Sequence, residues 1–301
     1  MRAFLFIGLL LFAADLSAQV SFELKYPEDR KSVARVNSKT HQLLTIGGQE
    51  IETKSNSSML IASTNGKRQP DKSMRVKGKI SEWQVDINLP GGIKLSFDAA
   101  NPDRKAENPA LEPILTLFRA QLRNTPVLTL DKENKIASVE YPADPEKELD
   151  PALKGTFNAK RAKIAAQQTL DRLPSKPVSK GDKWEREETF NLEAGQSLTL
   201  AKRYEYTGTV VKAGRTLHAI SAVSTSVKYE IDPESPSPIK VSKSDLKVID
   251  SKETILFDTE KGIVAEHVST LRVKGDLALS VNGMDLAGTV DLTISTETTV
   301  E

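Results

Sequence analysis

The sequence predicts a mainly β protein with two helices, of the α+β class, built from long antiparallel strands. Apolar and polar residues alternate with period two over most of the chain, which is typical of strands with one buried and one wet face. Only two segments have the spacing of helices. We therefore expect one or two curved sheets, or an open half-barrel, with the helices packed on the concave face.

The first 18 residues have the layout of a secretory signal peptide. Arg2 supplies a positive charge, residues 3–14 form an unbroken apolar run, and small residues lead to Ala18. The alternative is an N-terminal membrane anchor, but a run of this length is too short to span about 30 Å of hydrocarbon. We therefore expect cleavage near Ala18 and an exported protein, periplasmic or extracellular, of a bacterial envelope, without a later transmembrane segment.

The stretch 271–294 predicts a β-hairpin. Its large apolar residues are odd-numbered before Asn282-Gly283 and even-numbered after it. A two-residue Asn-Gly turn pairs residues across the hairpin so that all of these side chains fall on one face. The predicted pairs are Val281 with Met284, Leu279 with Leu286, Val273 with Leu292, and Leu271 with Ile294.

Other strands follow the same alternation in chain order. The residues 74–89 and 93–97 flank Pro-Gly-Gly and form a second predicted hairpin, and Gly47-Gly48 is interpreted as a turn. The remaining predicted strands are 20–26, 184–192, 198–211, 217–231 and 246–257.

Two segments predict helices. Residues 109–123 place Leu111, Ile114, Leu115, Phe118 and Leu122 at helical spacing, and Pro113 indicates that the regular helix starts late. Residues 159–173 contain good helix formers and no glycine or proline, and their apolar side is mostly alanine, which can lie close against a sheet.

Two similar acidic stretches divide the chain into an N-terminal β-rich half, 19–155, and a C-terminal half, 156–301. Asp131 and Asp258 each follow an apolar run and precede a returning strand. A calcium loop needs an oxygen ligand at its fifth position, and Lys135 occupies that position after Asp131. We interpret both stretches as turns, either used once in each half of a duplicated scaffold or similar by chance.

The composition excludes several chemistries. The chain has no cysteine, so it forms no disulfide, thiolate metal site or iron–sulfur cluster. Its histidines, His41, His218 and His267, lack metal-ligand spacing, and we expect no metal, cofactor or catalytic motif. The acidic group around Glu188 is expected on a solvated face. Forty-two basic and 41 acidic residues are interspersed without a basic block, so no nucleic-acid partner is expected.

Two short motifs resemble an uncharacterised, domain-of-unknown-function family of exported bacterial β-rich proteins. They are "LPSKPVSKGDKW" at 173–184 and "FDTEKGIV" at 257–264, with a fainter match, "IKLSFDAANPD", at 93–103. The resemblance covers roughly 156–301 and implies an architecture similar to the open, curved β-sheet of periplasmic lipoprotein carriers. It implies no activity.

The leading hypothesis is a non-enzymatic envelope protein that binds a lipid or another apolar or amphipathic ligand in a concavity. The alternatives are a structural or protein-interaction module that binds an envelope protein, and a hydrolase with an unrecognised site. A packed core without a cavity is the competing interpretation of the same side chains. The candidate lining residues are Leu111, Ile114, Leu115 and Phe118, facing Leu277, Leu279 and Leu286.

Overall fold

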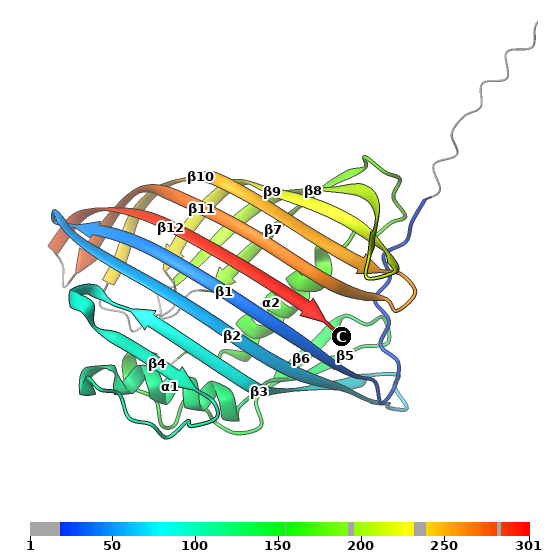
Figure 1. The fold of residues 1–301 in the computed structure, drawn as a ribbon, viewed down its shortest axis with the longest axis horizontal. Coiled ribbons are helices and arrows are strands. Elements are labelled where there is room, and N and C mark those ends of the chain that lie inside the picture. Colours follow the sequence, from blue (N-terminus) through cyan, green and yellow to red (C-terminus); the bar gives the residue numbers. More distant parts are fainter. Residues whose placement is uncertain (1–18, 154, 192–195, 232–238, 282–283) are drawn as a thin grey trace, which may run out of the picture.

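The structure, a computed structural model, describes residues 19–153, 155–191, 196–231, 239–281 and 284–301. These residues form one twelve-stranded antiparallel sheet that curves strongly without closing (Figure 1). The strand order is β6-β5-β3-β2-β1-β12-β11-β10-β9-β8-β7, and β4 pairs with β3. The strands are β1 Lys31–Ile46, β2 Gln49–Arg68, β3 Met74–Asn88, β4 Lys94–Asp98, β5 Val127–Leu130, β6 Ile136–Glu140, β7 Lys183–Asn191, β8 Gln196–Lys212, β9 Arg215–Ile231, β10 Ile239–Asp258, β11 Ile263–Val281 and β12 Met284–Val300.

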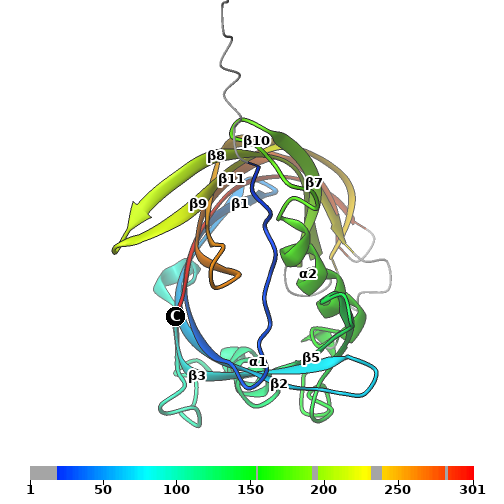
Figure 2. The same cartoon turned by 90° about the vertical axis from the view of Figure 1, so that its right-hand side faces the viewer.

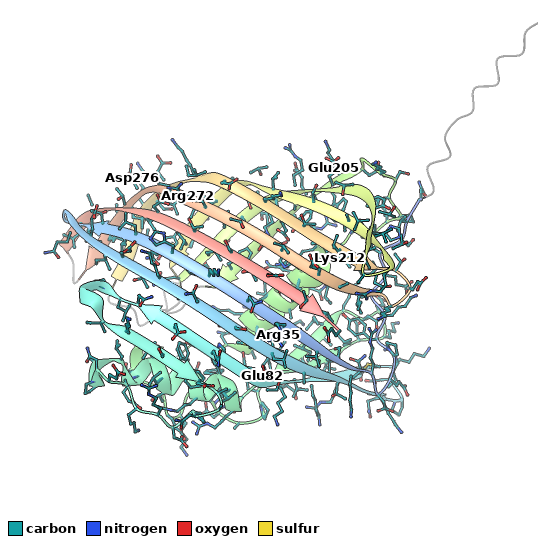
Figure 3. All side chains as sticks on the ribbon, in the orientation of Figure 1. Arg35, Glu82, Glu205, Lys212, Arg272 and Asp276 are labelled. Atoms are coloured by element: carbon teal, nitrogen blue, oxygen red, sulfur yellow. The ribbon has the colours of Figure 1, made fainter. Side chains whose placement is uncertain are left out.

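The two faces of the sheet differ as the alternation predicts. Charged side chains such as Arg35, Glu82 and Arg272 cover the outer, convex face (Figure 3). The inner face carries the apolar clusters, including the buried Val290 and Leu292 of β12. The predicted fold class, a mainly β protein with two helices on a curved sheet, is confirmed.

The predicted hairpin register is also confirmed. β11 and β12 pair Val281 with Met284, Leu279 with Leu286, Val273 with Leu292, and Leu271 with Ile294. The Asn282-Gly283 turn itself lies outside the described residues. The hairpin of β3 and β4 has the predicted Pro-Gly-Gly connection, with Asn88 opposite Lys94.

Both predicted helices are present, on the inner side of the sheet. A short 3₁₀ turn, Pro109–Leu111, leads into α1, Glu112–Arg123, and Pro113 lies in its first turn, in agreement with the predicted late start. α2 spans Ala159–Asp171 and ends two residues before the predicted boundary.

The two halves of the chain occupy two contiguous parts of the sheet. Strands β1–β6 form one part and β7–β12 form the other, and the ladder between β1 and β12 joins them. The two acidic stretches are turns at comparable places, between β5 and β6 and between β10 and β11. Asp131 Oδ1 accepts hydrogen bonds from the N–H groups of Glu133 and Lys135. Asp258 Oδ1 accepts one from Lys261 N–H. The prediction that they are turns is confirmed, and duplication stays a prediction.

The predicted strand at 20–26 is wrong. Only Val20 pairs, in an isolated bridge with Val178, and the rest of the segment crosses one end of the curved sheet (Figure 2). Phe22 is buried against Tyr206 and Phe257. The alternation therefore reflects side chains that enter the core from an extended segment, which needs no ladder.

The turn after β10 holds this crossing segment, which we call the N-terminal strap, residues 19–30. Lys25 Nζ donates hydrogen bonds to the carbonyl oxygens of Thr259 and Glu260, each at 3.1 Å. Lys25 N–H donates to Gly262 O at 3.0 Å. Gly262 has φ of +62°, and an added Cβ would lie 2.7 Å from Lys25 N. Both the backbone angle and the close approach therefore require glycine.

We expect Gly262→Ala to lower the free energy of unfolding by about 1–3 kcal/mol or more, because it adds a steric clash to a left-handed backbone. Gly47→Ala is the matched control, since Gly47 has φ of +56° and nothing within 4 Å of an added Cβ. Urea unfolding followed by tryptophan fluorescence measures both. Equal losses of unfolding free energy in the two variants would show that the contact between Gly262 and the strap does not stabilise the fold.

Candidate functional site

The middle of the inner face is lined by small hydroxyl side chains. Ser269, Thr296, Ser38 and Ser57 lie opposite one another in one row across β11, β12, β1 and β2. Each is partly exposed. Ser57 Oγ accepts a hydrogen bond of 3.1 Å from the indole N–H of Trp83, which lies on β3 opposite Met59. This row marks a section of the inner wall where little side-chain volume fills the concavity.

The neighbouring rows combine more hydroxyls with aliphatic side chains. Thr40 and Ser55 lie beside the first row, and neither hydroxyl has a hydrogen-bond partner among the described residues. No fully buried side-chain polar atom of the described chain lacks a partner, so these hydroxyls are open to solvent. We call this region the inner strip, and its remaining partly exposed members are Val36, Met59, Leu271, Ile294 and Thr298.

Two apolar clusters border the inner strip. Met59 packs against the cluster beneath α1, which contains Trp83 and Leu115. Leu271 and Ile294 pack against the cluster at the other end of β11 and β12. The strip is therefore a polar-and-aliphatic section between two apolar sections of one continuous wall.

The exposed area shows that the chain does not fold into a compact body. It exposes 18303 Å² in total. A compact protein of 33.0 kDa exposes about 12,500 Å². The 32 residues outside the described ranges can contribute at most about 5,000 Å², the value for an unfolded chain of that mass. The described residues alone therefore expose more than a compact protein of the full mass, as an open curved sheet does.

α2 lies between the two edge strands of the sheet, β6 and β7, and contacts both. Two successive glutamines bind the free backbone N–H groups of these edges. Gln167 Oε1 accepts from Ile136 N–H of β6 at 2.9 Å, and Gln168 Oε1 accepts from Thr189 N–H of β7 at 3.1 Å. An unpaired N–H at a sheet edge is otherwise a site for aggregation. The helix therefore closes the gap that the strands leave open.

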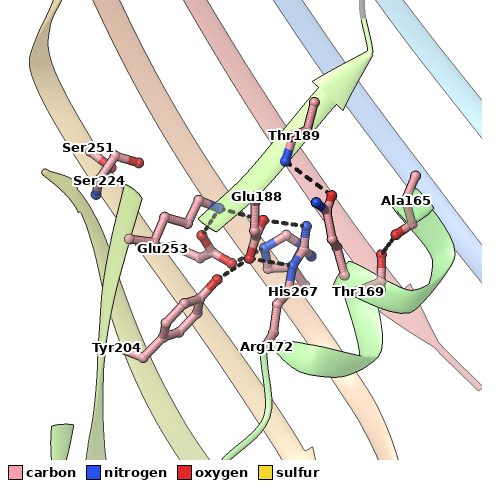
Figure 4. A network of polar contacts seen from close by, with 12 residues as sticks. Ala165, Thr169, Arg172, Glu188, Thr189, Tyr204, Ser224, Ser251, Glu253 and His267 are labelled. Carbon is pink, nitrogen blue, oxygen red and sulfur yellow. Dashed lines mark hydrogen bonds and ion pairs between the residues drawn. The ribbon is translucent and has the colours of Figure 1, made fainter. Parts of the chain in front are cut away.

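A network of buried charges fastens the C-terminal end of α2 (Figure 4). Arg172, just after the helix, forms two hydrogen bonds of 3.0 Å with the carboxylate of Glu188 on β7. Lys202 Nζ of β8 bridges Glu188 at 3.0 Å and Glu253 of β10 at 2.7 Å. The network also includes the Tyr204 hydroxyl, which donates to Glu188.

The expectation that Glu188 lies on a solvated face is wrong, because its side chain is only 3% exposed. The reason is local. β7 is an edge strand, and α2 covers the face that carries Glu188. Trp184 Nε1 also donates to Arg172 O at 3.0 Å, so the end of the helix is bound to this strand at two points. One sequence signal could have found it: Glu188 has the same parity in the strand as Trp184 and Phe190, and its exposed neighbours Glu185 and Glu187 have the opposite parity.

The network sets the protonation of its members. Burial opposes ionisation of Glu253, but the hydrogen bond from His267 Nε2 and the charges of Lys202 and Arg172 lower its pKa to about 2. Burial and the nearby Glu253 and Glu188 carboxylates raise the pKa of Tyr204 far above its usual range. Glu253 therefore stays ionised near neutral pH, and the Tyr204 hydroxyl stays neutral.

The structure divides the predicted lining residues between two clusters. Leu111, Ile114, Leu115 and Phe118 pack together on β3 and β4. Leu277 and Leu279 belong to the cluster at the far end of β11. Leu277 also lines a groove of about 580 Å³ with Leu286, whose rim carries Asp245 and Asp276. The prediction that these residues enclose a ligand stays a prediction.

The three histidines have separate surroundings. His41 contacts Glu52 on the outer face, and His218 contacts the Tyr206 hydroxyl at 2.7 Å. His267 contacts Glu253, and none of these contacts within the described chain involves a serine. No group of three or more His, Asp or Glu side chains in the described ranges is placed to hold a metal ion. None of the described helices is long and apolar enough to cross a membrane.

Comparison with known proteins gives only distant structural similarities. No protein-family model and no curated protein matches the chain. Lipovitellin is similar at a TM-score of 0.40 and 10% identity, over 92% of this chain and 25% of lipovitellin. The chain thus spans about a quarter of that protein's length.

Two bacterial structures are similar at lower scores. An outer membrane channel from Pseudomonas putida F1 has a TM-score of 0.28 and 7% identity over 93% of this chain and 98% of the channel. A DUF1329 family protein from Desulfovibrio piger ATCC 29098 has a TM-score of 0.14 and 7% identity over 88% and 84%. Scores of this size do not establish a shared fold, so function is inferred from this chain's own geometry. Membership of an uncharacterised exported family stays a prediction.

We expect Lys202→Met to lower the free energy of unfolding by about 3–5 kcal/mol, because it leaves two buried carboxylates without their shared cation. Lys202→Met with Glu253→Gln removes one of those charges, so the double variant is expected to lose less than the sum of the single losses. Urea unfolding at pH 7 measures the free energy of unfolding of Lys202→Met, Glu253→Gln and the double variant. Additive losses would show that Lys202 and Glu253 do not interact.

Acid should weaken the fold through Glu253. Its pKa is near 2 when folded, against an ordinary value of 4.5, so its ionised form favours folding. This contribution is complete above pH 4.5 and is lost as the pH falls from 4.5 toward 2. We expect Glu253→Gln to be less stable at pH 7 and to show a smaller loss of urea midpoint between pH 5 and 3. If the urea midpoint of the variant falls between pH 5 and pH 3 as much as that of the wild type, other carboxylates cause the acid destabilisation.

Proposed function

We propose that the protein is an exported envelope protein that binds an apolar or amphipathic ligand, such as a lipid, along the inner strip. The observation that supports this most directly is the strip itself: a concave wall with partly exposed aliphatic side chains and hydroxyls that lack protein partners. The inner face of a folded sheet is ordinarily filled by a second layer. Here α1 packs on β3 and β4, α2 lies between β6 and β7, and the side chains of the inner strip stay partly exposed.

The energetics favour an occupant with both apolar and polar groups. Covering aliphatic surface such as Val36, Met59 and Ile294 gains about 25 cal/mol for each Å² removed from water. The free hydroxyls of Thr40 and Ser55 would lose water on contact with a purely apolar chain, which costs free energy unless they regain a hydrogen bond. A ligand with an ester, phosphate or hydroxyl group beside an acyl chain covers the aliphatic surface and also forms hydrogen bonds with these hydroxyls.

The apolar clusters at the ends of the strip belong to the same proposal. Leu111, Ile114, Leu115 and Phe118 form the wall at the α1 end, next to Met59. The other end has Leu277 and Leu279, with Leu286 in the adjoining groove. A ligand longer than the strip would extend onto either cluster. Export rests on the signal-like segment 1–18, which lies outside the described residues.

α2 makes edge-to-edge pairing with a partner protein less favoured, since both edges are engaged by Gln167 and Gln168. The wall is held rigidly on both sides, which suits a receptor for a small molecule. A concave site fixed in shape binds with a smaller loss of conformational entropy than a site that must first order itself.

The test is native mass spectrometry of the full chain purified from the envelope of an expression host, followed by solvent extraction. We expect a bound species of lipid mass and binding of an apolar fluorescent dye that the extracted lipid displaces. If no lipid co-purifies and the dye finds no saturable site, the protein is not a lipid-binding protein.

A pair of adjacent substitutions locates the site. Ser55→Phe places an aromatic ring on the inner strip, and Asn56→Phe places the same ring on the outer face of the same strand, where Asn56 is exposed. We expect the first to weaken dye and lipid binding at least about tenfold, or about 1.4 kcal/mol, and the second to leave both unchanged. Equal effects of the two variants would place the ligand elsewhere.

A further inference from the structure

The fold places two further basic residues beside three that alternate along one strand. Arg75, Lys77 and Lys79 alternate along β3 and point to the outer face, since the residues between them face the inner clusters or the sheet. Lys31 of β1 lies in the same row as Lys77, with Thr64 between them. Arg123, the last residue of α1, lines a groove together with the three β3 cations. We call these five residues the basic face.

The charges of the basic face are only partly neutralised. Arg75 pairs with Glu140 at 3.2 Å, and Arg123 pairs with Glu148 at 2.9 Å. Lys31, Lys77 and Lys79 are exposed and have no acidic partner among the described residues.

Elsewhere on the outer face, charges of both signs are interspersed, and several of them are paired. Arg272 forms two hydrogen bonds with Asp291, and Lys54 pairs with Glu52 at 2.8 Å. An alternating run of lysines is by itself an ordinary solvated strand face. Three unpaired lysines on two strands, beside two arginines, form a local excess of positive charge in a chain whose formal net charge is only +1.

The groove beside these cations has an apolar side and a volume of about 600 Å³. It exists because β3 changes partners along its edge. β5 pairs with residues 74–77 and β4 with residues 84–88, so the residues between these ranges pair with β2 on one side and have no strand on the other. The end of α1 and the segment after β6 border the gap. The apolar lining comes from Leu122, Val127, Tyr141 and Pro142.

We propose that the basic face docks the protein onto an anionic lipid surface. The lysines bind headgroup phosphates, and the apolar groove accepts the part of a lipid next to its headgroup. Each lysine or arginine close to an anionic membrane surface adds to the attraction, which falls off within a Debye length. The groove explains why a lipid fits better than a free anion, because a free anion makes no use of apolar walls. The proposal is independent of any ligand on the inner strip.

The test is co-flotation of the full chain with vesicles of phosphatidylglycerol and phosphatidylcholine in equal amounts, and with pure phosphatidylcholine vesicles. We expect binding to the anionic vesicles alone, and release in 0.5 M salt. Lys77→Glu with Lys79→Glu should reduce vesicle binding at least about tenfold. The matched control is Lys247→Glu with Lys252→Glu, which makes the same change in net charge at exposed positions of β10.

Three results would overturn the proposal. The first is equal binding of the wild type to neutral vesicles, and the second is an equal loss in the β10 control. The third is complete competition by inorganic phosphate at matched ionic strength, which would assign the lysines to a free anion. Far-UV circular dichroism confirms the fold of each variant, and unchanged dye binding to the inner strip separates this proposal from the ligand-binding one.

Discussion

The curvature of the sheet depends on α2, which binds both of its edges. An open sheet of this size carries a row of unpaired backbone groups on each edge strand. Gln167 and Gln168 engage one edge each, and Arg172 fixes the end of the helix to Glu188. Burying these charges is costly, and the cost is offset only while every partner is present. The concave wall exists because this set of contacts holds two distant strands on one helix.

The clearest predictions from sequence concern elements in which large apolar residues alternate with charged ones. β11 and β12 are of this kind, and the parity change at Asn282-Gly283 determines their register. The strap shows the limit of the rule. Val20, Phe22 and Leu24 alternate because an extended chain turns successive side chains in opposite directions, whether or not a neighbouring strand is present.

β1 and β2 were not predicted as strands beyond the turn at Gly47-Gly48, and the reason is also the reason that they form the candidate site. Their inner positions carry Ser38, Thr40, Ser55 and Ser57 in place of large apolar residues. When both faces of a strand carry polar side chains, the sequence shows no alternation of apolar and polar residues. The small hydroxyls that conceal the strands are the same side chains that leave space on the inner wall.

The burial of a charged residue and the clustering of several such residues could not be predicted, because both depend on which other elements lie beside them in the fold. The parity that Glu188 shares with Trp184 and Phe190 places it on the inner side of β7, but the sequence does not show that α2 covers this edge strand and makes Glu188 a buried ion. The basic face, which is exposed, also depends on strand pairing. The sequence has no run of adjacent basic residues, and the pairing of β1 and β3 on either side of β2 adds Lys31 to three basic residues that alternate along β3.

The hydrogen-bonded ladders between neighbouring strands differ in length across the sheet. β9 and β10 pair only over residues 218–222 and 253–257. Beyond that ladder, the Ser251 hydroxyl accepts from Ser224 N–H at 2.8 Å in place of a backbone bond. A sheet bends most easily where its ladder is interrupted. Leu198 of β8 and Val273 of β11, which lies three strands away, belong to one apolar cluster on the inner face. The ladders that join β11, β12, β1 and β2 are unbroken, with no shift of register. The inner strip thus lies on ladders without a register shift, next to strands that carry large apolar side chains.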